Sequence, residues 1–254
     1  MKKIVALLVL FIFFFSTLSF AQEGNLYSVF FERAISLNEN NEYEKAEEQF
    51  RKAQQLLVEE FGLNETTHAT YCHILYRRAH NLYLIDGLQD SSYICFTELY
   101  DLSKTPIDTV SGNWFRIEST IMLSTIDLER GNIRECCKLL ESEKQMFDRL
   151  DSDTRLLHKY YYYKNLAKTY NHILVGFLSG EKYDFSFLES PYIIVRDGSF
   201  YNDYISVYKE LVNLSYRFNK DDLNEKTEDL IMLAEHCRIP DDSYLAERNY
   251  ERAF

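Results

Sequence analysis

Residues 34–53 read AISLNENNEYEKAEEQFRKA, and this stretch decides the fold class. Apolar and small residues recur every three or four positions on both sides of a polar segment at 38–41, which is helical spacing. Three alanines stand twelve and then seven positions apart, with large residues between them: Ala34, Ala46 and Ala53, with Tyr43 and Phe50. The stretch therefore predicts two helices joined by a break at 38–41, which approach each other closely at small residues.

The same spacing returns along the chain. Near the other end, Ser215, Thr227 and Ala234 repeat both intervals, whereas Ser124 and Cys136 repeat the first and Glu143 stands at the third small position. A second copy fits with a one-residue insertion, and a fourth has a degenerate second helix. Each copy is a pair of predicted helices, called here its first and second helix. The small residues of the first helices lie 45, 45, 43 and 48 positions apart: Ala34, Ala79, Ser124, Ala167 and Ser215.

This pattern resembles the tetratricopeptide repeat (TPR), so the chain is identified as a divergent, exported bacterial member of the TPR-like superfamily. The resemblance implies an all-α fold, an α-solenoid of antiparallel helix pairs that form a TPR-like superhelix. We expect about five helix pairs over residues 22–240 and a capping helix over 241–254. The period exceeds the 34 residues of the short repeat. Residues 180–199 form either a long loop or a pair of short strands.

The start of the chain has the layout of a cleaved secretory signal. Lys2 and Lys3 precede an apolar run from Ile4 to Phe15, and small residues end at Ala21. We expect cleavage after Ala21 and a periplasmic or secreted protein, because the run is short for a membrane span of roughly 20 residues. A retained membrane anchor is the alternative.

The composition supports helices and excludes several functions. Only 3 prolines and 8 glycines occur in 254 residues, which leaves few positions for tight turns. Without Lys2 and Lys3, 26 basic side chains face 40 acidic ones, a formal charge of −14. Nucleic acid and anionic membranes would be repelled. The five cysteines show no disulfide or zinc spacing, so we expect buried, small apolar side chains.

Enzyme signatures are absent from the sequence, and we predict no catalytic residue, no cofactor and no metal. Paired carboxylates such as Glu47-Glu48 are expected on solvated helix faces. The most site-like cluster has His and Cys residues four apart on one predicted helix. A zinc ion there would need Cys95 from the following helix as a further ligand, and we interpret the cluster as structural: His68, Cys72, His73, Tyr76 and His80.

In TPR arrays the first helices line a concave groove, so the resemblance implies a binding surface. The candidate binding residues are His73, Tyr76, His80, Tyr83, Tyr161, Lys164, Lys168, Asn171, Tyr216 and Asn219. Further groove positions fall at Phe31, Ile35, Asn38, Ile121, Thr125, Leu128 and Val212. This surface is rich in tyrosine, which offers a large contact area at low entropic cost. The Lys and Asn clamp of some family members is not reproduced in adjacent copies.

Four consecutive tyrosines, 160–163, must point around more than one helix face, so some of them lie at a surface or a repeat interface. Together these patterns predict an exported scaffold that binds a protein or peptide partner in its groove. The alternative is a ligand-sensing module related to the extracytoplasmic repeat region of bacterial signalling regulators. The sequence leaves the partner and the oligomeric state open.

Overall fold

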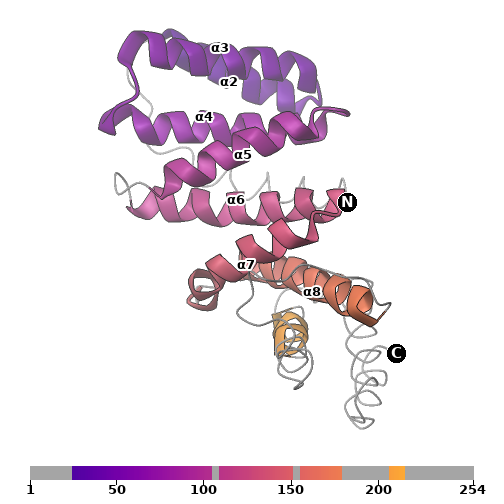
Figure 1. The fold of residues 1–254 in the computed structure, drawn as a ribbon. Coiled ribbons are helices and arrows are strands. Elements are labelled where there is room, and N and C mark those ends of the chain that lie inside the picture. Colours follow the sequence, from indigo (N-terminus) through magenta and orange to yellow (C-terminus); the bar gives the residue numbers. More distant parts are fainter. Residues whose placement is uncertain (1–24, 105–108, 151–154, 179–205, 215–254) are drawn as a thin grey trace. The chain divides into compact units, whose positions relative to one another are not determined.

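The computed structural model describes residues 25–104, 109–150, 155–178 and 206–214, and it is all-α over these ranges (Figure 1). The helices are α2 (Leu26–Glu39), α3 (Tyr43–Phe61), α4 (Glu65–Leu84), α5 (Gln89–Ser103), α6 (Thr109–Arg130), α7 (Ile133–Asp148) and α8 (Leu156–Leu178). A further helix covers 206–214, and no strand occurs within the described ranges. The all-α, helical-repeat prediction is confirmed.

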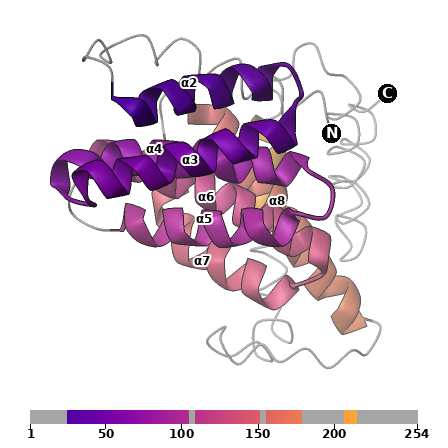
Figure 2. The same cartoon turned by 90° about the horizontal axis from the view of Figure 1, so that it is seen from above.

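The chain divides into two compact units, residues 1–88 and 89–254. In the first unit α2 packs against α3, and α3 against α4. Figure 2 shows α2 and α3 side by side along their length. In the second unit α5 packs on α6, α6 on α7, and α8 on both α6 and α7. The boundary falls inside the second expected helix pair.

The turn between α2 and α3 lies at the predicted break. Asn41 adopts a φ of 61°, a left-handed conformation that Asn tolerates better than most residues. The backbone N–H of Glu42 then donates to the carbonyl of Leu37, which closes the end of α2. Ala34 and Ala46 are fully buried beside Phe50, so small residues do stand where these two helices meet.

The first helices keep their small residues buried along the described chain. The exposed fraction is 0% for Ala34, Ala79 and Ser124 and 1% for Ala167, which confirms this part of the repeat register. The second copy agrees with the predicted one-residue insertion: Ser92, thirteen positions after Ala79, is fully buried on α5 at the second small position. Ser215, the fifth small position, lies outside the described residues, as do 180–199 and the expected cap at 241–254.

In the second unit, α6, α7, α8 and the last described helix share a core in which aromatic and polar groups mix. Phe147 of α7 stacks on Tyr162 of α8 with ring centroids 4.0 Å apart, and the Tyr162 hydroxyl donates to the carbonyl of Leu140. Residues 207, 208, 211, 212 and 214 of the last described helix join this core. In the part of the chain that the structure describes, no helix is long and apolar enough to cross a membrane.

Candidate functional site: the faces of the first helices

The four candidate residues on α4 share one helix face but not one environment. His73, His80 and Tyr83 are partly buried, whereas Tyr76 is only 2% exposed and belongs to the core. The ring of His80 packs edge-on against Tyr76, with centroids 4.5 Å apart. The surface that α4 offers to a partner therefore excludes Tyr76.

Helix α2 extends this face through Phe31. The Phe31 ring lies 5.3 Å from His73 and 5.9 Å from Phe50, so it joins the α4 face to the core of the first helix pair. Ile35 also packs partly buried against that core. The structure thus brings Phe31, a groove position predicted on α2, against His73, a candidate on α4.

Asn38, the third groove position on α2, holds the helices together. Its side-chain N–H donates to the amide oxygen of Asn81 over 2.8 Å, and Asn81 in turn donates to the backbone carbonyl of Tyr43. Asn81 is fully buried, where an unpaired amide would cost about 1–3 kcal/mol. Asn38 therefore has a structural partner.

Two adjacent arginines on α4 differ sharply in their partners. Arg78 binds the Glu47 carboxylate at 2.8 Å and the Gln54 side-chain oxygen at 2.9 Å. Arg77 is partly buried, its Nε is shielded from solvent, and no described residue accepts a hydrogen bond from it or pairs with its charge. Nothing in the sequence singles out Arg77, because the repeat pattern assigns it no groove role.

Burial sets the charge state of this face. It lowers the pKa of Arg77, and it lowers the pKa of His73 to about 4 with help from the positive charge of Arg77 one turn away. His73 is therefore neutral at pH 7 and Arg77 carries the charge. An anion next to Arg77 would find a cation with which no carboxylate of the described residues forms an ion pair.

In the second unit the predicted groove positions of α6 are largely structural. Ile121 is 8% exposed and packs in the core. The Thr125 hydroxyl donates to the Ile121 carbonyl and accepts from the Asn165 amide of α8 at 3.0 Å. Asn165 also donates to Ser124, so three polar groups link α6 to α8 where the prediction expected contact surface.

Helix α8 offers the more open surface. Lys168 is exposed, and Tyr161, Lys164 and Asn171 are partly buried. The ammonium group of Lys164 lies 5.6 Å from the Tyr160 ring centroid, within reach of a cation–π contact. Tyr161 is the member of the tyrosine run that reaches the surface, because the other three are at most 7% exposed.

A histidine–carboxylate pair also bridges α6 and α8. His158 and Glu118 lie 2.6 Å apart through Nε2 and Oε1, and their side chains are 15% and 5% exposed. The pair holds the two first helices of this unit together. Neither residue was singled out from the sequence, because the two lie 40 positions apart and no local motif links them.

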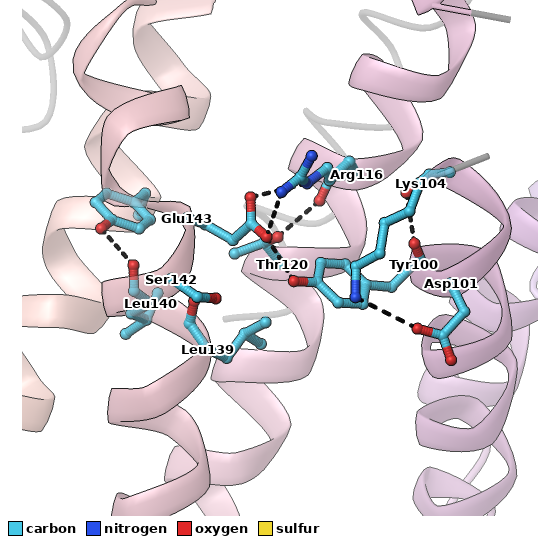
Figure 3. Close-up of polar contacts among 11 residues, drawn as sticks. Tyr100, Asp101, Lys104, Arg116, Thr120, Leu139, Leu140, Ser142 and Glu143 are labelled. Atoms are coloured by element: carbon cyan, nitrogen blue, oxygen red, sulfur yellow. Dashed lines mark hydrogen bonds and ion pairs between the residues drawn. The ribbon is translucent and has the colours of Figure 1, made fainter. Parts of the chain in front are cut away.

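The position where Glu143 breaks the small-residue pattern is a polar centre (Figure 3). Glu143 is 1% exposed, and Arg116 of α6 and Tyr100 of α5 both point toward its carboxylate. Arg116 lies 2.8 Å from one carboxylate oxygen, and the Tyr100 hydroxyl donates to the other. Burial, followed by the bond to Glu143, raises the pKa of Tyr100 to about 12. This network ties three helices together.

The described residues hold no group of three or more donors suited to a metal ion. The sulfur of Cys72 lies 3.9 Å from Nδ1 of His68, and both residues are buried. Cys72, Cys95, Cys136 and Cys137 are buried free thiols, which agrees with the burial predicted from the sequence. Tyr216 and Asn219 lie outside the described residues, and Val212 is buried in the core.

Charge is distributed unevenly between the two classes of helix. The first helices α2, α4, α6 and α8 carry eight basic and six acidic residues, and α8 has three lysines and no carboxylate. The second helices α3, α5 and α7 carry six basic and twelve acidic residues. Among the described helices of this acidic chain, α4 and α8 are thus the ones with an excess of positive charge.

Comparison with known proteins shows a fold likeness to solved TPR-like repeats. Two crystal structures of nearly identical TPR-like repeats, from a protein described as a kinesin light chain of Podosopora anserina, match with TM-scores of 0.54 and 0.53. The identities are 11% and 13%, and the matches cover 92% and 91% of this chain and 95% of each of those chains. No known family model matches the sequence, and no curated protein does.

Proposed function

The chain has the TPR-like fold, and from this we propose that it is an exported scaffold that binds a protein or peptide along the faces of its first helices. TPR-like repeats generally mediate protein–protein contacts and are typically not enzymes. The observation that carries the proposal is this fold, and the net positive charge of α4 and α8 supports the choice of face.

Helix α8 supplies the surface for this contact in the second unit. Tyr161 offers an aromatic face, and Lys164 and Lys168 offer long side chains with cationic ends, which together suit a peptide that carries apolar and acidic groups. Buried partners fix the helix behind them, because Asn165 and Thr169 bond to α6 and α7. Such a surface is presented on a rigid element, which lowers the entropic cost of binding.

The test is capture of the partner from the protein's own cells. A triple variant of the α8 surface, Y161A/K164A/K168A, should lose at least 90% of the captured partner that mass spectrometry identifies with the wild type. A matched variant of three residues on the second helix α7, K138A/S142A/K144A, should keep it. Equal capture by both variants, with helicity unchanged in circular dichroism, would count against this face.

Export is the second part of the proposal and has its own test. The Lys2-Lys3 start, the apolar run and Ala21 support cleavage before Gln22. The mature protein recovered from cells should begin at Gln22 in N-terminal sequencing. An N-terminus at Met1 in the cytosolic fraction would contradict export and leave the binding proposal untouched.

A further inference from the structure

Arg77 lowers the folding stability of the first unit. A partly buried cation without a carboxylate partner costs stability, whereas Arg78 beside it is paired with Glu47. Glu39 of α2 is the acidic residue whose charge reaches Arg77, yet it is exposed and forms no ion pair with it.

The surroundings of Arg77 suit an anionic group with an apolar neighbour. His73 lies one turn before it on the same face of α4 and is neutral at pH 7, so an imidazole N–H is available to donate. Phe31 of α2 stands against His73 at 5.3 Å. A guanidinium fork, one further donor and an aromatic wall are the groups that recognise a carboxylate carried on an apolar peptide.

We propose that Arg77 and His73 form a subsite for one carboxylate of a bound peptide, with Phe31 in contact with the adjacent apolar part of that peptide. The subsite rests on the proposed function and names the chemistry of its partner. The net charge of the mature chain disfavours a polyacidic segment, so the partner carries a single carboxylate among apolar residues. That carboxylate belongs to an aspartate or glutamate side chain or to a chain terminus.

The test uses three synthetic peptides at up to 10 mM, followed through the histidine resonances of the 13C-labelled full-length mature protein. Acetyl-Phe-Asp-Phe-amide should shift the His73 signals and raise its apparent pKa, because a bound anion offsets the charge of Arg77. Acetyl-Phe-Asn-Phe-amide should bind at least tenfold more weakly. Acetyl-Phe-Gly-Phe with a free terminal carboxylate identifies a terminus as the source if it binds more tightly than the aspartate peptide.

Two variants separate the subsite from a general charge effect. Arg77→Met should abolish the preference for the acid over the amide and raise the Tm, because it removes an unpaired buried charge and keeps the apolar stem. Arg33→Gln, which removes an exposed charge from α2, should keep the preference. Equal binding of acid and amide, no response of His73 to any peptide, or a lower Tm in Arg77→Met would overturn the subsite.

The subsite and the proposed function fail in different ways. Equal binding of the acid and amide peptides by the wild type, with continued capture of the partner in the pull-down, would overturn the role of Arg77 alone. Loss of capture in the α8 triple variant does not depend on Arg77. The peptide titration therefore tests Arg77, and the pull-down tests the surface of α8.

Discussion

The two units have the same repeat spacing, but different types of residue occupy its small positions. In the first, the helix pair meets through Ala34, Ala46 and Phe50, all apolar and at most 1% exposed. In the second, polar residues stand at comparable positions: Ser124 and Cys136 replace the small apolar residues, and Glu143 stands where a third is expected. One register thus tolerates polar substitutes, provided that each buried polar group finds a partner.

Because of this difference, we expect different kinds of mutation to lower the stability of the two units. The first unit depends on shape, so removing volume should damage it most. The second depends on pairing between buried polar groups, so removing a charge at constant volume should be enough to destabilise it. Amide hydrogen exchange read helix by helix is the suitable measure, because it reports the stability of each unit separately.

The largest effect is expected in the first unit. Phe50→Ala should lower the free energy of unfolding of α2 and α3 by about 4 kcal/mol, through lost burial and the cavity left behind. The matched control is Phe61→Ala on the same helix, where the side chain is 43% exposed and the loss should stay below about 1 kcal/mol. Similar losses in both variants would contradict the shape-dependent core.

In the second unit, Glu143→Gln should cost about 3 kcal/mol without any change in volume, because Arg116 loses its counter-charge in a buried network. A third of the Arg116 side chain is exposed, which holds the cost at the low end of the range for buried pairs. Glu135→Gln on the exposed side of α7 serves as control. Equal protection in both variants would mean that pairing does not hold this unit.

The pH dependence of the first unit should follow His73. Its pKa in the folded state, about 4, lies below its unfolded value of about 6.5, so the unfolded chain binds more protons between these pH values. Stability is therefore lost as the pH falls, by about 2 kcal/mol between pH 7 and pH 5 from this residue. His73→Gln should remove that part of the decrease in chemical denaturation curves.

If wild type and His73→Gln lose stability in parallel over this pH range, His73 is not buried as a neutral group. His172, exposed on α8, is the matched control, and His172→Gln should leave the pH dependence of the first unit unchanged.

The smallest effect compares two asparagines before helices. Asn64 caps α4 in the first unit, where its side chain accepts from the backbone N–H of Thr66 and Thr67. Asn64→Ala should lower protection in α4 by about 1 kcal/mol. Asn132 precedes α7 in the second unit but donates to Asp127 instead of capping. Asn132→Ala should therefore leave the first turn of α7 unchanged.

The sequence predicted the fold well where local periodicity carries the information. Small residues at a near-constant interval located α2, α4, α6 and α8, and the turn after α2 fell at the expected break. The polar centre around Glu143 was visible only as a departure from the pattern. Its partners Tyr100 and Arg116 lie 43 and 27 positions away, and no local rule connects residues so distant.

The candidate site was harder to predict, because the repeat pattern specifies a helix face but not the depth of each side chain on it. Tyr76 and Ile121 have groove positions in the pattern and are buried in the structure. Arg77 was missed for the opposite reason: a sequence shows an arginine but not whether a carboxylate lies beside it. Pairing between helices decides this, and pairing follows from packing.

The most direct test of the account asks which class of helix meets the partner. A photoreactive benzoylphenylalanine at Lys168 of the first helix α8 should cross-link to the captured protein on irradiation in cells. The same group at Lys138 of the second helix α7, also exposed, should give no adduct with it. Adducts at Lys138 and none at Lys168 would contradict binding on the faces of the first helices.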